Sequence, residues 1–558
     1  MSTAAKQPAP QTGAGLLVKS LEAQGVEYIF GIPGAKIDTV FDTLLDSKIK
    51  TVVCRHEQNA AFIAAGIGRM TGKAGVALVT SGPGCSNLVT GLATANSEGD
   101  PVVAIGGAVA TGDRLKQIHQ SMDTVNLLRP ITKFSAEIDS ADSVSEVIAN
   151  AFRAAESGRP GAAFVSAPKD IMAGTARGEV LTPATPGTLG PADADAIAAA
   201  CYLIGNARQP VLLLGLLASQ PAAAQAVRGL LAKTQLPVVC TYQGAGIVPR
   251  ELFDRFGGRV GLFHTQPADK LLDAADVVLS VGYDPIEYEP GLWNHGTSRT
   301  LIHVDVVPAD IDKDYRPQLE LTGNIAATIE ELTTRLAGNE LPANSALLAE
   351  IVQDRALFAQ RAAAKNGVPI HPMRLVKELQ ALLSDDMTLC LDMGSFHIWL
   401  ARYLYSFRAR QILMTNGQQT LGVGLPWAIA ASLVRPNEKV ISISGDGGFL
   451  FSAMELETAV RIKCNLVHLV WIDGAYDMVG FQEVAKFGRT SGVDFGPVDV
   501  VRYAEAFGAT GLRIETPDRI SSTIRKALAM PGPVIVGVPV DYRDNHRFME
   551  IVHPSALN

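Results

Sequence analysis

Short runs of apolar, mostly β-branched residues recur along the chain, separated by longer stretches in which apolar residues repeat at helical spacing. Strands that alternate with helices in this way build parallel sheets covered by helices. The pattern therefore predicts an α/β protein. The clearest strand-like runs cover residues 76–80, 101–105, 162–166, 211–214, 277–281, 301–305, 440–444, 466–471 and 534–538.

Two segments interrupt this alternation and divide the chain into three parts. Residues 173–192 are rich in Gly, Pro and Thr, and residues 338–367 are polar and Ala-rich, which is typical of linkers. A chain of 558 residues is long enough for three domains of ordinary size. We therefore predict three doubly wound parallel-sheet domains, which cover residues 1–175, 190–340 and 366–545.

Composition narrows the class of protein. The formal charge of −8 gives no basic face for nucleic acid or anionic lipid. No apolar run approaches the roughly 20 residues that a membrane span needs, and residues 1–12 lack the apolar core of a signal peptide. The six cysteines are scattered singly, which indicates reduced thiols rather than disulfides or a zinc site. We therefore expect a cytoplasmic protein that binds neither nucleic acid nor membrane.

The carboxyl-terminal third carries a glycine-rich turn directly after a predicted strand. Residues 445–448 read Gly-Asp-Gly-Gly, and glycine amides at a helix start approach and favour a phosphate. The next apolar run ends at Asp473, 27 positions after Asp446, so both carboxylates would lie at the same edge of one sheet. Carboxylates readily bridge Mg²⁺ to phosphate. From these residues alone, a structural turn and a phosphate and magnesium site are equally open interpretations.

The amino-terminal third carries an acidic residue at a comparable place. Residues 54–61 read Cys-Arg-His-Glu-Gln-Asn-Ala-Ala, follow a candidate strand and open a helix. The His-Glu pair is not a zinc protease motif, because Ala60 stands where that motif needs its second histidine. By itself Glu57 is a helix-start carboxylate that interacts with the helix dipole. The glycine-rich turns at 30–36 and 80–84 are, taken singly, equally consistent with structural loops.

Taken together, these segments resemble the thiamine-diphosphate enzymes. The Gly-Asp-Gly turn with an acid 27 positions later resembles the signature that binds thiamine diphosphate in that family. Nearly the whole chain is similar to the acetohydroxyacid and acetolactate synthase branch, above all to its catabolic, FAD-independent acetolactate synthases of acetoin and butanediol metabolism. The most specific stretches are residues 31–38, 55–69, 79–87, 96–103, 119–123, 392–399, 416–427 and 445–457.

The resemblance implies a thiamine diphosphate and Mg²⁺ site. Asp446, the Asp473 side chain and the Ala475 carbonyl would hold the metal ion. Family members commonly carry Asn-Asn where this chain has Asp473-Gly474, but an aspartate is an adequate oxygen ligand. The added negative charge should tighten metal binding.

The resemblance also implies how the cofactor is held. Glu57 would hydrogen-bond the pyrimidine ring and activate the cofactor. In the loop at 418–426, Leu421 would support the bend of the cofactor, and the Gln419 carbonyl would accept from its 4′-amino group. Further cofactor contacts are implied for Gly34, Ser81, Ser395, Phe396, His397, Gly445, Asp446, Gly447, Gly448, Ala475, Tyr476 and Met478.

The implied reaction is that of an acetolactate synthase, which decarboxylates one pyruvate and joins its two-carbon unit to a second pyruvate, giving 2-acetolactate and CO₂. Lys36 and Gln120 are the expected polar contacts of pyruvate. Biosynthetic synthases carry Trp at the position aligned with Gln482, where it favours 2-oxobutyrate as acceptor, so its absence favours pyruvate as both donor and acceptor. The catalytic residues are thus expected to be Glu57, Lys36, Gln120 and Gln482, and the pocket walls Met393, Met478, Val479 and Gln482.

Two further expectations concern FAD and assembly. Biosynthetic relatives bind FAD in the middle domain, whereas residues 282–290 are acidic and proline-flanked and would not suit a flavin diphosphate. We therefore expect no FAD. The resemblance implies a homodimer or homotetramer with active sites at the subunit interface, where Glu57 and Asp446 come from different chains, and no regulatory subunit.

Four other classes of protein are alternatives to an acetolactate synthase. The main one is the catalytic subunit of a biosynthetic acetohydroxyacid synthase. A 2-oxo acid decarboxylase would lack the contexts of Lys36 and Gln120 and often carries paired active-site histidines. A non-catalytic thiamine-fold protein is disfavoured because Glu57, Asp446 and Asp473 are all present. A nucleotide-binding dehydrogenase is disfavoured because no Gly-x-Gly-x-x-Gly opens a strand–helix unit with an acid about 20 residues later.

Overall fold

The computed structural model describes residues 11–183, 187, 189–264 and 266–548. It confirms the α/β prediction with three six-stranded parallel sheets, and each predicted run overlaps a strand. Residues 1–10, and residues 184–186 and 188 of the first predicted linker, lie outside the described part. The chain forms two compact units. One contains residues 1–186, 429–435 and 454–462, and the other contains residues 187–428, 436–453 and 463–558.

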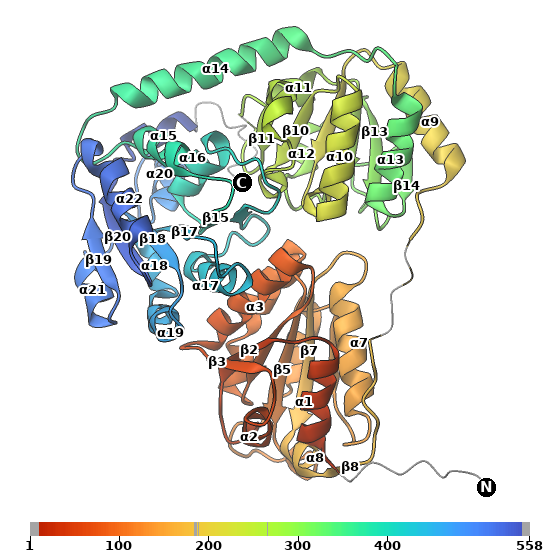
Figure 1. Cartoon of the computed structure of the whole chain (residues 1–558), viewed down its shortest axis with the longest axis vertical. Helices are drawn as coiled ribbons and strands as arrows, with labels where there is room; N and C mark the ends of the chain where they lie inside the picture. Colours follow the sequence, from red (N-terminus) through yellow and green to blue (C-terminus); the bar gives the residue numbers. More distant parts are fainter. Residues whose placement is uncertain (1–10, 184–186, 188, 265, 549–558) are drawn as a thin grey trace. The chain divides into compact units, whose positions relative to one another are not determined.

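The sheet of the first unit has the order β3-β2-β4-β5-β7-β6. Figure 1 labels its strands β2, β3, β5 and β7. Its strands are β2 (Tyr28–Ile32), β3 (Lys50–Val53), β4 (Gly75–Val79), β5 (Val102–Ala108), β6 (Phe134–Glu137) and β7 (Ala162–Pro168). Its helices are α1 (Gly13–Ala23), α2 (Asp38–Leu44), α3 (Glu57–Thr71), α4 (Pro83–Ser86), α5 (Val89–Glu98), α6 (Thr124–Leu128), α7 (Val144–Glu156) and α8 (Lys169–Ala173). Helices α1, α2 and α7 form one packed group, and α3 and α5 another. Strands β4, β5 and β7 are buried along their whole length, as expected where helices cover both faces of a parallel sheet.

Helix α3 begins at Glu57, as the sequence predicts. His56 has an extended backbone, and its Nδ1 accepts a hydrogen bond of 3.1 Å from the N–H of Gln58. This contact satisfies one of the donors that a helix start leaves unpaired. The helix ends at Gly72, whose φ of 73° is the left-handed conformation that terminates many helices. Glu57 is thereby fixed in the first turn, after strand β3.

The second unit holds two parallel sheets, of which the first has the order β11-β10-β9-β12-β13-β14. Its strands are β9 (Pro210–Leu214), β10 (Val238–Thr241), β11 (Phe256–Val260), β12 (Val277–Val281), β13 (Thr300–Asp305) and β14 (Leu319–Thr322). Its helices are α9 (Ala194–Gly205), α10 (Pro221–Lys233), α11 (Asp269–Ala274), α12 (Pro290–Trp293) and α13 (Ile325–Leu336). The strand order reverses between β9 and β12, and doubly wound sheets bind ligands in the crevice outside such a switch point.

The last sheet has the order β16-β15-β17-β18-β20-β19. Its strands are β15 (Thr388–Leu391), β16 (Ile412–Met414), β17 (Val440–Gly445), β18 (Leu466–Ile472), β19 (Thr510–Arg513) and β20 (Val534–Pro539). The helices of this part are α15 (Pro372–Leu382), α16 (Ser395–Tyr403), α17 (Gly424–Val434), α18 (Asp446–Leu450), α19 (Leu456–Arg461), α20 (Asp477–Phe487), α21 (Val500–Ala506) and α22 (Ile520–Ala529). Strands β17 and β18 pair directly, with Gly445 opposite Trp471. The segments that follow them therefore leave the same sheet edge, as the 27-residue spacing predicts.

The two predicted linkers contain more regular structure than expected. Residues 338–367 include α14 (Ser345–Ala364), a helix of 20 residues that Figure 1 shows as one long segment. This part of the segment is helical because its Ala, Leu, Glu, Gln and Arg residues are strong helix formers. Its role as a linker stays a prediction. In the first linker, β8 (Thr175–Ala176) pairs antiparallel with β1 (Gln11–Thr12).

The structure also describes the apolar helices and the cysteines of the chain. No helix in the described part of the chain combines the length and the apolarity that crossing a membrane requires. All six cysteines fall in that part and are free thiols, five of them buried.

Candidate active site

Glu57 lies in a buried position in the first unit, with its side chain held by a single amide. Only 8% of the residue is exposed. Asn87, which follows α4, donates from Nδ2 to Glu57 Oε2 at 2.8 Å. No described residue donates a hydrogen bond to the other oxygen, Oε1. The carboxyl group is therefore oriented on one side and available to a ligand on the other.

A second carboxyl group fixes the chain just before Glu57. Glu455 is fully buried, and its Oε1 accepts from the N–H groups of Arg55 at 2.8 Å and His56 at 3.1 Å. The same oxygen accepts from Asn59 Nδ2 at 3.2 Å. Burial raises the pKa of Glu455. Residues 454–462 thus belong to the first unit and anchor the start of α3, although they follow α18 in the sequence.

Glycines bring the loops after β2 and β4 into close contact with each other. A Cβ added to Gly34 would lie 2.6 Å from the Thr80 side chain, so only glycine fits there. A Cβ added to Gly84 would lie 3.0 Å from the same threonine and 3.6 Å from Glu57 Oε1. Gly34, Thr80, Gly84 and Glu57 therefore form one continuous edge of the first sheet.

The predicted substrate contacts lie in the same set of loops. Ser81 donates from Oγ to Gln120 Oε1 at 3.4 Å, and Gln120 adopts a positive φ of 64°. Lys36, in the turn between β2 and α2, is half-buried and forms no ion pair with any described residue. The structure thus joins Ser81 to Gln120, while the roles of Lys36 and Gln120 toward pyruvate stay predictions.

Asp446 and Asp473 follow the paired strands β17 and β18. The carboxylate of Asp446 accepts from the N–H groups of Gly447 at 3.1 Å and Gly474 at 2.9 Å. Burial raises the pKa of Asp446, and burial together with Asp446 and Asp477 raises the pKa of Asp473 to about 8. Carboxylates crowded in this way suit a divalent cation, which would remove their mutual repulsion.

The metal site expected from the resemblance uses two carboxylates and one backbone carbonyl. In the described part of the chain, no three or more His, Cys, Asp or Glu side chains are grouped so that they could hold a metal ion. A site with only two carboxylates would not form such a group. Ala475, the expected source of the carbonyl, forms a β-bridge with Asp494. The ligand set of Asp446, Asp473 and Ala475 stays a prediction.

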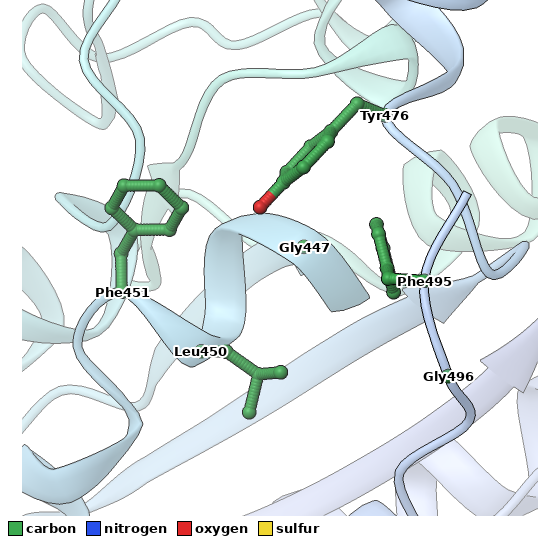
Figure 2. A pocket seen from close by; sticks show the side chains of 6 residues that line it. All are labelled: Gly447, Leu450, Phe451, Tyr476, Phe495 and Gly496. Atoms are coloured by element: carbon green, nitrogen blue, oxygen red, sulfur yellow. The ribbon is translucent and has the colours of Figure 1, made fainter. Parts of the chain in front are cut away.

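A cavity of about 540 Å³ lies beside the glycine-rich turn. A Cβ added to Gly447 would lie 2.7 Å from the Tyr476 ring, so the turn and the ring are in contact. Figure 2 shows the Tyr476 ring above the first turn of α18, with Phe451 and Phe495 at either side. The cavity is lined by Gly447, Leu450, Phe451, Tyr476, Phe495 and Gly496. Its volume is in the range of small-molecule sites.

The three residues expected to contact the diphosphate from α16 have side chains engaged within the domain. Ser395 donates from Oγ to Asp477 Oδ2. The Phe396 ring meets Trp471 edge-on at 5.9 Å between centroids. The buried His397 ring donates from Nδ1 to the Asp392 carbonyl at 3.1 Å. Their contacts with the cofactor stay predictions.

Asp392, which the sequence did not single out, anchors the predicted cofactor loop (residues 418–426). Its buried carboxyl group accepts from the N–H groups of Met393 at 2.8 Å, Gly422 at 2.9 Å and Gly424 at 3.1 Å. Burial raises the pKa of Asp392 to about 6. Leu421 Cδ2 lies 3.6 Å from the Cβ position of Gly448, which places the expected wedge beside the glycine-rich turn.

The predicted pocket walls lie on α20 and beside Asp392. Met478 and Gln482 stand one turn apart on α20, on the same helix face, and both are partly buried. Val479 is 50% exposed. Met393 is buried in the last domain. Thus Met478 and Gln482 share a face, whereas Val479 points to another side of the helix.

Comparison with known proteins agrees across the chain. Family profiles of thiamine pyrophosphate enzymes match residues 11–127 as the N-terminal TPP binding domain, 197–332 as the central domain and 392–538 as the C-terminal TPP binding domain. The catabolic acetolactate synthase of Raoultella terrigena is 53% identical over 547 residues, which are 98% of each chain. The chain belongs to the acetolactate synthase family of thiamine pyrophosphate enzymes.

Two other acetolactate synthases are similar over comparable lengths. The acetolactate synthase of Bacillus subtilis (strain 168) is 52% identical over 96% of this chain and 94% of its own. The acetolactate synthase isozyme 2 large subunit of Escherichia coli (strain K12) is 31% identical over 98% of both chains. The resemblance stated from the sequence is therefore confirmed, and the enzyme uses thiamine pyrophosphate, that is, thiamine diphosphate.

Three residues that hold the candidate site in place were not predicted from the sequence. Asn87, Glu455 and Asp392 hold Glu57, the start of α3 and the cofactor loop. Each lies inside a stretch that carries the family resemblance, and this overlap is the signal that would have found them. Their partners were not visible, because those partners lie far away in the sequence or are backbone amides.

Proposed function

We propose that this enzyme is a catabolic acetolactate synthase that uses pyruvate as both donor and acceptor and feeds acetoin and butanediol formation. The observation that carries the proposal is its 53% identity over 98% of both chains to the catabolic enzyme of Raoultella terrigena. Identity to the acetolactate synthase isozyme 2 large subunit of Escherichia coli is lower, at 31%. A biosynthetic catalytic subunit is the alternative.

Glu57 is the proposed catalytic acid–base group. It would hydrogen-bond the pyrimidine ring and hold a proton there, with Asn87 fixing Oε2 and leaving Oε1 for the ring. Bound thiamine diphosphate supplies the carbon nucleophile and takes up the electron pair left when CO₂ departs. Burial of Glu57 limits competition from water for the same hydrogen bond.

We further propose Mg²⁺ as the metal ion, held by Asp446, Asp473 and the Ala475 carbonyl. The raised pKa of Asp473, caused by burial and by its acidic neighbours, supports a site built for a cation. The tight Gly447 turn would bring backbone N–H groups close to the diphosphate. The role of these residues is to bind and orient the cofactor.

Pyruvate is proposed as the acceptor because of the residue at position 482. Gln482 and Met478 share one face of α20, and neither fills space as a tryptophan would. Lys36 and Gln120 would bind the pyruvate carboxylate through a cation and an amide. Their position in the first unit, among the loops that also hold Ser81 and Glu57, supports this assignment.

We propose that the enzyme works without FAD. The crevice at the switch point of the middle sheet is closed by the chain itself. A Cβ added to Gly215 would lie 2.4 Å from the Gly282 carbonyl oxygen and 2.8 Å from Glu287 Oε1. A flavin diphosphate placed there would meet these atoms. Tight, stoichiometric FAD binding in a titration would contradict this proposal.

The proposed assembly is a homodimer or homotetramer without a regulatory subunit, in which each active site combines Glu57 of one chain with Asp446 of another. Exposed apolar side chains on α20 support burial of that helix by a second copy; they are Val479, Val484 and Phe487. A fully active monomer in light scattering would contradict it. The single, mostly buried thiols support a cytoplasmic location.

The experiment that tests the function is a pyruvate assay with Mg²⁺ and thiamine diphosphate and without FAD. Acetolactate is converted by acid to acetoin and measured by colour. We expect strong colour that disappears when thiamine diphosphate is omitted. Acetaldehyde as the product would instead identify a simple decarboxylase, and a requirement for FAD would favour the biosynthetic alternative.

A further inference from the structure

The carboxyl group of Glu287 occupies the switch-point crevice of the middle sheet. Glu287 is 2% exposed, and both of its oxygens lie 3.0 Å from the N–H of Leu216, just after β9. Oε1 also accepts from the N–H of Asp284, after β12, at 3.1 Å. Thr241 Oγ1, at the end of β10, lies 2.5 Å from Oε2. One side chain therefore ties together the ends of three neighbouring strands.

The N–H groups of Leu216 and Asp284 and the hydroxyl of Thr241 all have Glu287 as their acceptor, so they need no bound ligand. In doubly wound sheets, backbone amides at the switch point commonly bind phosphate groups of a ligand. Here Glu287 takes the amides of Leu216 and Asp284, and it pairs with no cation in the described part of the chain. Burial raises the pKa of Glu287 to about 8. Oε1 accepts both N–H groups, while Oε2 accepts from the Thr241 hydroxyl and from the N–H of Leu216.

The Glu287 turn connects directly to the chain just before the cofactor loop (residues 418–426). Asn416 is buried, and its Nδ2 donates to the carbonyl oxygens of Glu287 and, at 3.5 Å, of Ile286. Asn416 lies two positions before the loop that carries Gln419 and Leu421. The loop is thus held at its beginning by the middle domain through Asn416.

The other end of the same loop is held by the last domain. Asp392 accepts from the N–H groups of Gly422 and Gly424. Between the two anchors, Gln419 has a φ of 50°, a conformation that a free chain rarely adopts for a residue with a side chain. A loop with such a conformation keeps its shape when both ends are fixed, and it relaxes when one end is released.

We propose that Glu287 is a positioning residue for thiamine diphosphate: it fixes the 284–288 turn in the switch-point crevice, and the turn in turn fixes Asn416 and the cofactor loop. Glu287 does not contact the cofactor. The middle domain thereby contributes to cofactor affinity through the site that a dinucleotide would otherwise fill. The inference rests on the proposed function only in assigning residues 418–426 to the cofactor.

The test compares three substitutions in the full-length protein. Glu287→Ala removes the carboxyl group, Glu287→Gln keeps the shape of the side chain and one carbonyl acceptor for the two backbone N–H groups, and Glu289→Ala is a matched control. Glu289 lies in the same turn, two positions on, and is exposed. Thiamine diphosphate affinity is measured by quenching of intrinsic fluorescence in the presence of Mg²⁺. Melting temperature and circular dichroism report the fold.

We expect Glu287→Ala to weaken thiamine diphosphate binding about tenfold, in proportion to one lost buried hydrogen bond. The KM for pyruvate should change less than the cofactor affinity. Glu287→Gln should restore affinity to within about twofold of the unmodified protein, and Glu289→Ala should leave it unchanged. If Glu287 only stabilised the fold, Glu287→Ala would lower the melting temperature. Cofactor affinity would then not fall in Glu287→Ala and recover in Glu287→Gln.

If Glu287→Ala does not fold, a substitution of Asn416 tests the inference instead. Asn416→Ala removes the link from the loop side, and it should weaken cofactor binding by a similar factor. Combined with Glu287→Ala in a folded double variant, the two effects should not add. Unchanged cofactor affinity in folded Glu287→Ala or Asn416→Ala protein overturns the inference, as does an equal loss in Glu287→Gln. Because binding is read without pyruvate, an unmodified enzyme that makes no acetolactate would overturn the proposed function and not this inference.

Discussion

Asn87 Nδ2 and Glu57 Oε2 are joined by a hydrogen bond of 2.8 Å, and this bond orients the proposed catalytic carboxyl group. Glu57 begins α3, while Asn87 follows the glycine-rich turn after β4. The two residues meet because their strands, β3 and β4, lie on either side of β2 in one parallel sheet. The geometry of Glu57 therefore depends on a residue that the chemistry of the cofactor would not identify.

Replacing Glu57 with Gln should abolish most of the activity while leaving the fold intact. The amide cannot exchange a proton with the pyrimidine ring, so we expect kcat to fall by at least about 100-fold. Steady-state kinetics with pyruvate measure the loss, and circular dichroism serves as the folding control. A variant with near-normal turnover would remove Glu57 from the mechanism.

Replacing Asn87 with Ala should lower kcat by about tenfold, because the carboxyl group of Glu57 loses the bond that orients it. The KM for pyruvate should change less. Ser86→Ala is a suitable control, since Ser86 only donates to the Pro83 carbonyl within its own turn. Equal kinetics for both variants would show that Asn87 does not orient Glu57.

Glu455 should contribute to stability and activity together. Glu455→Ala leaves the N–H groups of Arg55 and His56 without their acceptor, so we expect a loss of about 1–3 kcal/mol in the free energy of unfolding. Activity should fall as well, because the start of α3 carries Glu57. Urea denaturation and kinetics are the measurements. Glu457→Gln, two positions on and partly exposed, is expected to have little effect.

The two proposed metal ligands should respond differently to substitution. Asp446→Ala removes a ligand and also the acceptor for the N–H groups of Gly447 and Gly474, so Mg²⁺ should no longer restore activity after treatment with EDTA. Asp473→Asn keeps an oxygen ligand and removes a charge. We therefore expect it to need more Mg²⁺ but to recover activity. Equal recovery of both variants would argue against this ligand set.

Cofactor binding should weaken in acid because of Asp392. Burial raises its pKa from 3.8 to about 6. Above pH 6 the ionised group accepts the N–H groups of Gly422 and Gly424, whereas below it the added proton competes with those donors. Thiamine diphosphate affinity, measured on both sides of pH 6, should fall as the pH drops. In Asp392→Asn protein this dependence should be lost.

The same raised pKa of Asp392 has the opposite pH dependence in folding stability, which falls as the pH rises. Because the pKa of Asp392 is higher in the folded than in the unfolded chain, the folded state binds more protons between these two values. The stability that this group contributes is full below pH 3.8 and is lost as the pH rises through about 6. Denaturant titrations at several pH values measure this term. A stability difference between the unmodified protein and Asp392→Asn that does not change with pH would contradict it.

The sequence pattern was sufficient for the sheets and for part of the site. Continuous apolar runs identified strands such as β12 and β18, because parallel strands covered on both faces need no polar alternation. The order Gly445-Asp446-Gly447 after such a run placed a turn at a sheet edge. The helix α14 was missed, since it buries only Leu348, Ile351 and Ala362 and so shows weak periodicity.

The sequence by itself determined where many of the strands lie and, through its family resemblance, which cofactor the protein uses. These are decided by local periodicity and by short motifs that are contiguous along the chain. Only the tertiary structure decided how Glu57 is oriented and how the cofactor loop is held. Glu455 meets Arg55 across 400 positions, and Asn416 meets Glu287 across 129. A buried polar group needs a partner, and folding alone brings that partner from a distant part of the chain.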